Sequence, residues 1–401
     1  MVSEIPERCS LSSLKNEMYV LISGNSILTP DIIDFLCRYN RVHFLYKFNK
    51  PVDNLPDSIT HIIFDNYFNQ PVTYQTESSQ NGKSPTLLPN LLKYIRFGDM
   101  FNQPVEKLPE GLEEIIFGDD FNHPIENLPK NLKKLEFGWD FNQPIGGDFL
   151  EGKSSILPDT ITHICFGELF NQPLLNLPSS LTNLILGTEF NSPIFIPEFV
   201  EFIQFGDHFN SQIIFHPDQK SLKEIFFNYS FNRNIDHLPD SVEIINLGYN
   251  FNQPIKKFPK SLKKIRFGRK FNNTIENLPV GLDSLEFGDS FNQPVDNLPN
   301  TISYLLFGLK FNQSVNYLPE SLETLIFGDN FNQLVENLPN KLKRLVFGKD
   351  FNQSLADIPK TISEVFLYFN WSQLKYKQLP YETIPEGIKC DQITNFMRFH
   401  S

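Results

Sequence analysis

The sequence predicts a β-rich solenoid, a coil of about fifteen twenty-residue units with one short parallel strand per unit and a small helical N-terminal cap. First, the pair Phe-Asn recurs from Phe48 to Phe369, at most places every 20 residues. Second, prolines and a glycine recur at constant places in each copy and leave too little room for a stable helix. Third, apolar and variable residues alternate before each glycine, which is typical of a strand with one inward face.

The unit is clearest in residues 291–310, "FNQPVDNLPNTISYLLFGLK", with Phe291 counted as position 1. Prolines occupy positions 4 and 9, aliphatic residues positions 5, 8, 12 and 15, Phe position 17 and Gly position 18. The strand is expected near positions 14–18, with side chains 15 and 17 inward and 14 and 16 outward. The copies near 190–230 break the spacing, and a local change in the coil is expected there.

Two kinds of internal ladder are expected. Phe at positions 1 and 17 should stack from unit to unit. Asn at position 2 is expected to be buried and to bind backbone groups of the neighbouring unit through its amide. In the regular copies the ladder residues are Phe251, Asn252, Phe271, Asn272, Phe291, Asn292, Phe311, Asn312, Phe331 and Asn332.

The segments "FNQPI", "FNQPV" and "FNHPI" resemble the FNIP repeat, which is named from its Phe-Asn-x-Pro core. The resemblance extends from residue 48 to about 370, and "LPxxLxxLxF" is similar to the short leucine-rich repeat. One departure is that Asn follows the last apolar strand residue by five positions instead of three. The resemblance implies a leucine-rich-repeat-like solenoid of the kind known in amoebae and large DNA viruses, at times behind an F-box, and implies no catalytic activity.

The two ends of the chain lack the repeat pattern of residues 291–310. Residues 1–47 are expected to form a helical N-terminal cap, 48–372 the FNIP repeat solenoid and 373–401 a C-terminal cap. "TPDIIDFLCRYN" predicts a helix with Thr29 as N-cap and Pro30 in its first position, and "LSSLKNEMYVLI", residues 11–22, predicts a second. Alternatively, residues 1–47 are a degenerate F-box, which would make the chain a substrate-recognition adaptor of a ubiquitin ligase that binds a Skp-type adaptor.

Positions 14 and 16 vary most and should lie on the open face of the parallel sheet, where we expect a protein partner to bind. An unselected surface is the alternative. Apolar members would form an exposed patch. The candidate partner-binding residues are Tyr94, Arg96, Lys134, Phe202, Phe226, Lys264, Arg266, Tyr304, Leu306, Ile326 and Arg344.

Composition argues against several other functions. The net charge of −12, with no basic stripe, makes nucleic acid and anionic membranes unlikely partners. The N-terminus is acidic and the chain has no long apolar run, so neither a signal peptide nor a membrane span is predicted. The four cysteines are dispersed, which indicates a reducing compartment. We therefore expect a cytoplasmic protein, in the host cytoplasm if the chain is viral, with no metal or cofactor.

One motif points to a different function. "GDFLEGKS", residues 147–154, matches the P-loop pattern. It lies in an insertion between Ile145 and Leu157, with no predicted strand before it and no predicted helix after it. Asp148 and Glu151 would also repel phosphate. Nucleotide binding is therefore a remote alternative, and the chain is expected not to be an enzyme.

Overall fold

The computed structural model describes residues 19–23, 27–72, 88–145, 157–368 and 389–393. It is a parallel β-solenoid of about 16 turns with repeats of about 20 residues, which confirms the predicted fold class. The chain divides into two compact units, residues 3–219 and 220–401.

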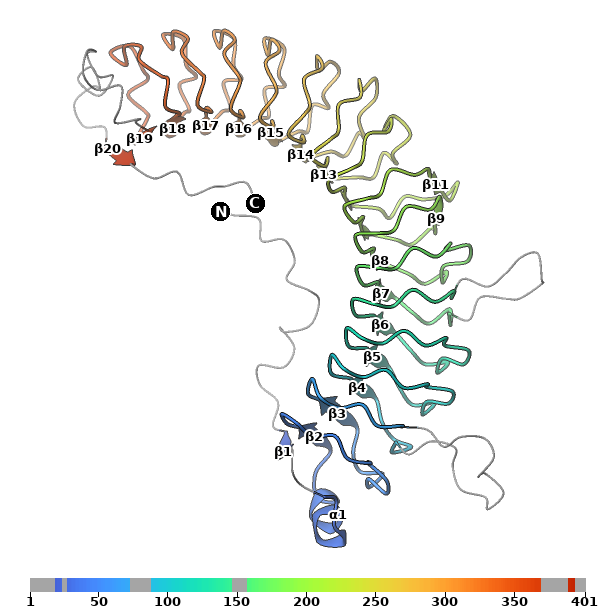
Figure 1. Ribbon diagram of the computed structural model, residues 1–401. Coiled ribbons are helices and arrows are strands. Elements are labelled where there is room, and N and C mark those ends of the chain that lie inside the picture. Colours follow the sequence, from blue (N-terminus) through green and yellow to red (C-terminus); the bar gives the residue numbers. More distant parts are fainter. Residues whose placement is uncertain (1–18, 24–26, 73–87, 146–156, 369–388, 394–401) are drawn as a thin grey trace. The chain divides into compact units, whose positions relative to one another are not determined.

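In the first unit each strand pairs in parallel with the strand of the next turn (Figure 1). The main-sheet strands are β1 (Val20–Ile22), β2 (Arg41–Phe44), β3 (His61–Phe64), β4 (Tyr94–Arg96), β5 (Glu114–Ile116), β6 (Lys134–Glu136), β7 (His163–Cys165), β8 (Asn183–Ile185) and β10 (Phe202–Gln204).

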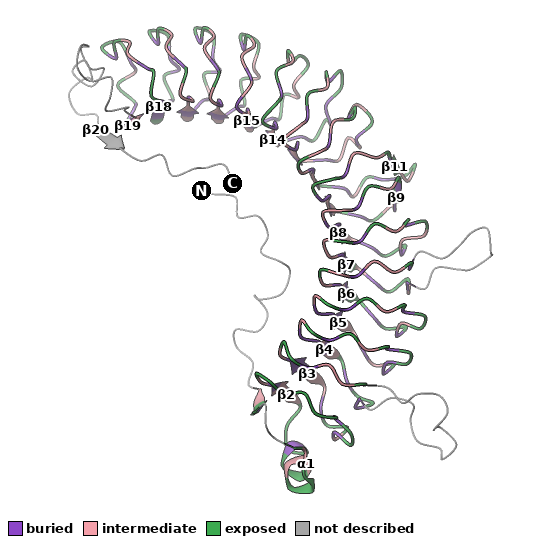
Figure 2. Ribbon diagram, in the orientation of Figure 1, coloured by how far each residue is buried: buried purple, intermediate pink, exposed green. Residues whose placement is uncertain are grey.

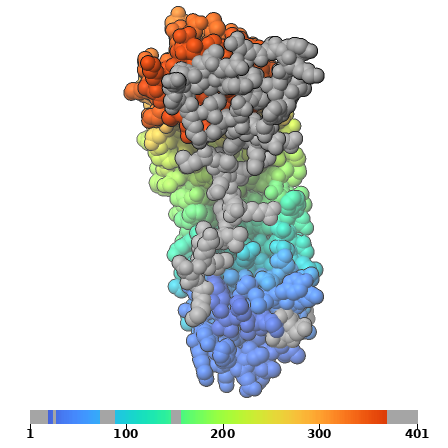
Figure 3. Space-filling model, turned by 90° about the vertical axis from the view of Figure 1, so that its left-hand side faces the viewer, coloured from blue at the N-terminus to red at the C-terminus, as the bar shows by residue number. Residues whose placement is uncertain are grey.

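The second unit continues the same pattern of parallel neighbours. Its strands are β12 (Glu224–Phe226), β13 (Ile244–Asn246), β14 (Lys264–Arg266), β15 (Ser284–Glu286), β16 (Tyr304–Leu306), β17 (Thr324–Ile326), β18 (Arg344–Phe347), β19 (Glu364–Tyr368) and β20 (Lys389–Ile393). The turns stack in sequence order within each unit, as the colours of Figure 3 show.

The register between turns follows the repeat. Leu285 of β15 pairs with Leu305 of β16, and Leu305 with Leu325 of β17, so position 15 always meets position 15. All three leucines are fully buried. Buried residues recur in every described turn of each unit, as the purple segments of Figure 2 show. The apolar residue at position 12 is also buried, and its N–H donates to the carbonyl of the proline at position 9, as in Leu322 to Pro319, 3.1 Å. The proline carbonyl therefore accepts a hydrogen bond at a tight corner, where the missing proline N–H leaves no hydrogen bond unmade.

The glycine at position 18 is required by close approach of successive turns. A Cβ placed on Gly308 would lie 2.2 Å from the carbonyl oxygen of Gly288, and the same contact recurs along both units. No side chain fits at such a distance. From sequence this glycine was predicted only to break helices, because its neighbour in space is twenty residues away in the regular copies.

The phenylalanines form a double column inside the coil. Phe287 and Phe291 stack within a turn with ring centroids 3.7 Å apart, whereas Phe291 and Phe311 of successive turns are 6.1 Å apart. The closest ring contact thus joins positions 17 and 1 across a corner. Stacking between turns is the longer contact, and together they fill the interior with aromatic surface.

The N-terminal segment differs in part from the expected helical cap. Helix α1 (Pro30–Leu36) is present, with the Thr29 hydroxyl accepting from the Ile32 N–H, as predicted. The prediction of a helix over residues 11–22 is wrong at its C-terminal end, because Val20–Ile22 form β1, which pairs with β2. Strand β1, helix α1 and strand β2 thus make a strand–helix–strand turn of the solenoid. Residues 1–18 lie outside the described part.

The irregular copies build a second small sheet. Strands β9 (Ile194–Ile196) and β11 (Ile213–Phe215) pair in parallel on the return side of two successive turns, where other described turns of the first unit have no strand. At the other end, β20 falls in the segment expected to be the C-terminal cap and extends the main sheet beside β19. The insertion containing residues 147–154 lies outside the described residues.

Candidate functional site on the strand face

The strand face is the set of outward side chains at positions 14 and 16 of the main sheets. In the second unit, β13 to β19 lie along the inner side of an arc (Figure 1). Tyr94, Arg96, Phe202, Phe226, Lys264, Arg266, Tyr304, Leu306 and Ile326 are half-buried on this face, while Lys134 and Arg344 are exposed. All the candidate partner-binding residues therefore lie on one kind of surface, distributed over the two units.

The apolar residues of the strand face are less exposed than expected. None of Tyr94, Phe202, Phe226, Tyr304, Leu306 or Ile326 is among the exposed large apolar side chains, and the neighbouring Val346 is buried, with 6% exposed. The cause is the spacing of a parallel sheet, about 4.8 Å, at which each side chain is covered from both sides by its row neighbours. On the described strands the face is closely packed, and these six side chains do not form the predicted exposed patch.

In the first unit the strand face combines aromatic and ionisable groups. His61 and Tyr94 stack with ring centroids 5.7 Å apart. Burial and the nearby cations of Arg41 and Lys93 lower the pKa of His61 to about 4, so its imidazole is neutral at physiological pH. Burial and the neighbouring Glu114 raise the pKa of Tyr94.

Two carboxyl groups stand near one another on β5 and β6. Burial and the charge of Glu114 raise the pKa of Glu136 to about 7, although Lys134 and Arg96 act in the opposite direction. Burial also raises the pKa of Glu114, whose carboxylate is 4.0 Å from the Lys134 ammonium. Glu136 is therefore partly protonated at neutral pH, which makes this part of the strand face sensitive to pH.

In the second unit the strand face has an apolar centre between cations. Glu286 pairs with Lys264 at 2.9 Å and with Arg266 at 3.7 Å. On the other side of Leu306 and Ile326, the Arg344 guanidinium lies 4.8 Å from the centroid of the Phe366 ring. Burial and Glu286 raise the pKa of Tyr304 to about 12, so the Tyr304 hydroxyl remains protonated and can donate a hydrogen bond.

The Asn ladder, at position 2, lies just after the turn that follows each strand and has a structural role. The Asn292 side-chain oxygen accepts from the backbone N–H of Asn312 at 2.9 Å and from the Gln313 amide at 3.1 Å, and this pattern repeats from turn to turn. The asparagines are exposed or half-buried, not buried as expected. Each amide replaces the strand pairing that is absent at this corner.

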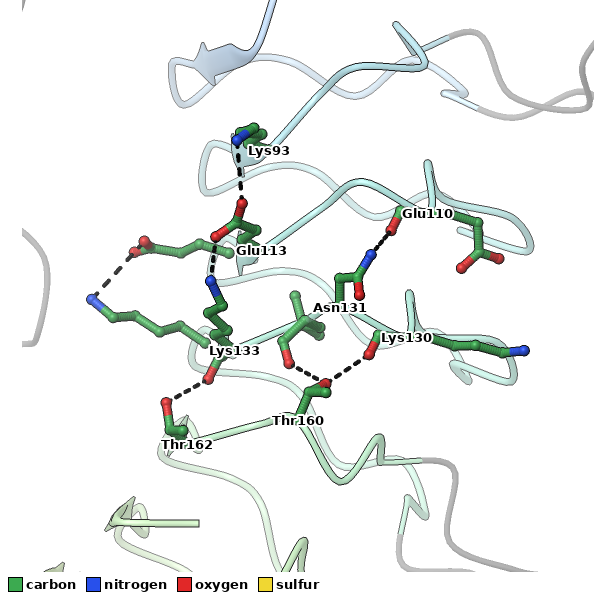
Figure 4. A network of polar contacts seen from close by, with 11 residues as sticks. Lys93, Glu110, Glu113, Lys130, Asn131, Lys133, Thr160 and Thr162 are labelled. Carbon is green, nitrogen blue, oxygen red and sulfur yellow. Dashed lines mark hydrogen bonds and ion pairs between the residues drawn. The ribbon is translucent and has the colours of Figure 1, made fainter. Parts of the chain in front are cut away.

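A row of opposite charges flanks the strand face at position 13. Glu113 accepts from Lys133 at 2.6 Å and is 3.5 Å from Lys93, so three successive turns alternate in charge (Figure 4). In the second unit Glu243 is bracketed in the same way by Lys223 and Lys263. These exposed pairs favour the observed stacking register, with small individual energies.

Nothing in the described ranges suggests metal chemistry, since no three His, Cys, Asp or Glu side chains gather closely enough there to hold an ion. In the same residues no helix has the length and apolar character of a membrane span.

Comparison with known proteins agrees with this description. The sequence model of the FNIP repeat matches residues 48–74, 84–195 and 231–337 in nine copies, of which those within 84–195 overlap. CroV588, described as a novel circular leucine-rich-repeat protein, is 29% identical, with a TM-score of 0.57 over 88% of this chain. The chain spans 66% of CroV588, slightly under two thirds. YopM from Yersinia enterocolitica WA-314 is 19% identical over 88% of this chain and 76% of its own, with a TM-score of 0.52, and shares the fold. No curated protein shows significant sequence similarity to the chain.

Proposed function

Because this chain belongs to the FNIP repeat family, whose leucine-rich-repeat-like fold is typical of protein-interaction scaffolds, we propose that it binds a protein partner through its strand face. The binding centre would be Tyr304, Leu306 and Ile326 in the second unit, flanked by Lys264 and Arg266 on one side and by Arg344 on the other. We also place this function in the cytoplasm, where dispersed reduced cysteines are stable.

The observation that carries the proposal is the contrast between constant and variable positions. Inward positions repeat the same apolar residues in successive turns, whereas the strand face changes at every turn from Ser284 to Tyr304 to Thr324. A rigid sheet with an aromatic and aliphatic centre and a charged rim has the composition of a protein interface. Preorganisation also reduces the entropy lost on binding.

The test is affinity purification from source cells with mass spectrometry, using the wild-type chain and two double variants. Leu306→Glu with Ile326→Glu places charge at the proposed centre. Val280→Glu with Tyr317→Glu places the same charge on side chains that are 84% and 73% exposed elsewhere in the same unit. We expect a partner that the control variant retains and the face variant loses, with both variants folded by circular dichroism. Equal recovery by all three chains would contradict the proposal.

A role as a ubiquitin-ligase adaptor would need residues 1–47 to form a separate F-box. Strands β1 and β2 belong instead to the solenoid sheet, which favours a capping role for this segment. The observations therefore support the scaffold function and add nothing to the adaptor alternative.

A further inference from the structure

We propose that a second surface, the acidic corner of the first unit, docks a basic segment of a partner protein that also carries apolar side chains. The acidic corner is the set of six residues Met100, Asp119, Asp120, Trp139, Asp140 and Leu169. They come from positions 19 and 20, just after the strand, of four successive turns. It is distinct from the strand face, so this inference does not depend on the function proposed above.

The residues of the acidic corner lie directly above one another. The backbone N–H at position 20 donates to the carbonyl at position 19 of the preceding turn, as in Asp140 to Asp119 at 2.8 Å and Leu169 to Trp139 at 3.0 Å. Asp119 also accepts from the Trp139 N–H at 3.2 Å. Side chains from distant parts of the sequence are therefore held in one row, at a spacing of about 5 Å per turn.

The three carboxylates of the acidic corner, Asp119, Asp120 and Asp140, have no ion pair among the described residues. Three like charges on two adjacent turns repel each other, and the repulsion is relieved by counter-ions or by a cationic partner.

The same corner of the second unit serves as an internal comparison. There, Arg269 pairs with Asp289 at 2.5 Å and Lys349 with Asp329 at 2.7 Å. Positions 19 and 20 thus accept cations without harm to the fold, and acidic residues are not a structural requirement. The fold therefore does not require the unpaired aspartates of the first unit.

Exposed apolar side chains adjoin these carboxylates, with Met100 and Leu169 on either side of Asp120 and Asp140 at position 20 and Trp139 next to Asp119 at position 19. Met100, Trp139 and Leu169 are 45%, 46% and 40% exposed. Large apolar groups in a charged row are typical of an interface that is covered in use, since their burial against a partner is favourable.

Charge complementarity identifies the class of occupant. Anionic polymers and anionic lipid surfaces are repelled by the carboxylates, whereas Lys and Arg side chains are attracted and stack on Trp. The row from Met100 to Leu169 spans three turn spacings, roughly 15 Å, which is about ten residues of helix. A basic amphipathic segment of about that length places cations beside the aspartates and apolar groups over Met100, Trp139 and Leu169.

The experiment uses the full chain with Trp371→Phe, so that Trp139 is the one remaining tryptophan. This parent chain is titrated with a synthetic 14-residue peptide of Lys residues, with Leu at helical i, i+3, i+7 spacing. A second peptide has Ser in place of every Leu. Trp139 fluorescence and calorimetry report binding at physiological salt. Asp120→Lys with Asp140→Lys tests the charges, and Met100→Ser with Leu169→Ser tests the apolar contacts.

Matched controls carry the same changes on the return side of the same unit: Glu106→Lys with Glu126→Lys, both exposed, and Leu175→Ser. We expect the Leu-containing peptide to bind at least tenfold more weakly to the charge variant, at least fivefold more weakly to the apolar variant, and unchanged to the controls. The Ser peptide should bind at least tenfold more weakly than the Leu peptide. No binding by the parent chain, equal binding of both peptides, or equal losses in the control variants would overturn the proposal.

Discussion

The glycine at position 18 shows how a single residue sets the distance between turns. The backbones of successive turns approach so closely at this corner that a Cβ on Gly308 would overlap the carbonyl of Gly288, whereas a Cβ on Gly281, in the same unit, would have nothing within 4 Å. The first glycine is required by packing and the second is not.

This contrast gives a matched pair of substitutions. Gly308→Ala should lower the free energy of unfolding by at least about 2 kcal/mol, because two turns must separate to admit the methyl group. Gly281→Ala should be neutral or stabilise by about 0.5–1 kcal/mol, since alanine restricts the unfolded chain and the site is open. Urea denaturation of the two variants provides the comparison, and similar midpoints would contradict the close-approach role.

Other residues show what the sequence can and cannot predict. The Phe-Asn pairs, prolines and alternating strand residues are each local signals repeated many times, so the solenoid and its inward positions were predictable. The exposure of the Asn ladder was not, because an amide between apolar neighbours in sequence lies at a corner open to solvent in space. The half-burial of Tyr304 and Leu306 likewise depends on row neighbours twenty residues away.

At the scale of elements, β1 explains where the sequence prediction failed. In the turn that begins with β1, helix α1 takes the place of the proline-containing segment that connects one strand to the next in the later turns. The repeat pattern that identifies the later turns is therefore missing here. The apolar residues of Val20–Ile22 then fit a helical pattern equally well. Pairing with β2, a tertiary contact, decides in favour of a strand.

Strand β6 carries a pH-dependent contribution to stability. The pKa of Glu136 is raised to about 7 by burial and by Glu114, while in the unfolded chain the pKa is about 4.3. The folded state therefore binds a proton that the unfolded state releases, so the contribution is complete below about pH 4 and is lost as pH rises through 7.

Glu136→Gln should remove this dependence. We expect little change near pH 4 and a stability gain of about 1–2 kcal/mol at pH 8, a value reduced for partial solvation of the carboxyl group. Denaturation midpoints measured between pH 4 and 8 check the expectation, with Glu106→Gln, at an exposed position, as the control. A constant difference between wild type and variant across this range would show that Glu136 keeps an ordinary pKa.

At the scale of the whole molecule, stability is transmitted along the stack. Each turn contacts its predecessor and successor through the sheet, the phenylalanine column and the Asn ladder. Such arrays behave as linear chains of nearest-neighbour interactions, so damage in one turn spreads to its neighbours and fades with distance.

Phe291→Ala in the full chain tests this transmission. Phe291 is fully buried between Phe271 and Phe311, and its loss should cost about 3–5 kcal/mol through the cavity left behind. Hydrogen exchange should accelerate most in β15 and β16, less in β14 and β17, and little in β4–β7 of the first unit. Tyr317→Ala, at an exposed side chain, should leave the exchange pattern unchanged. If exchange accelerated equally in every strand, the molecule would unfold as one cooperative block, and the strand face and the acidic corner could not be perturbed independently by substitutions in their own turns.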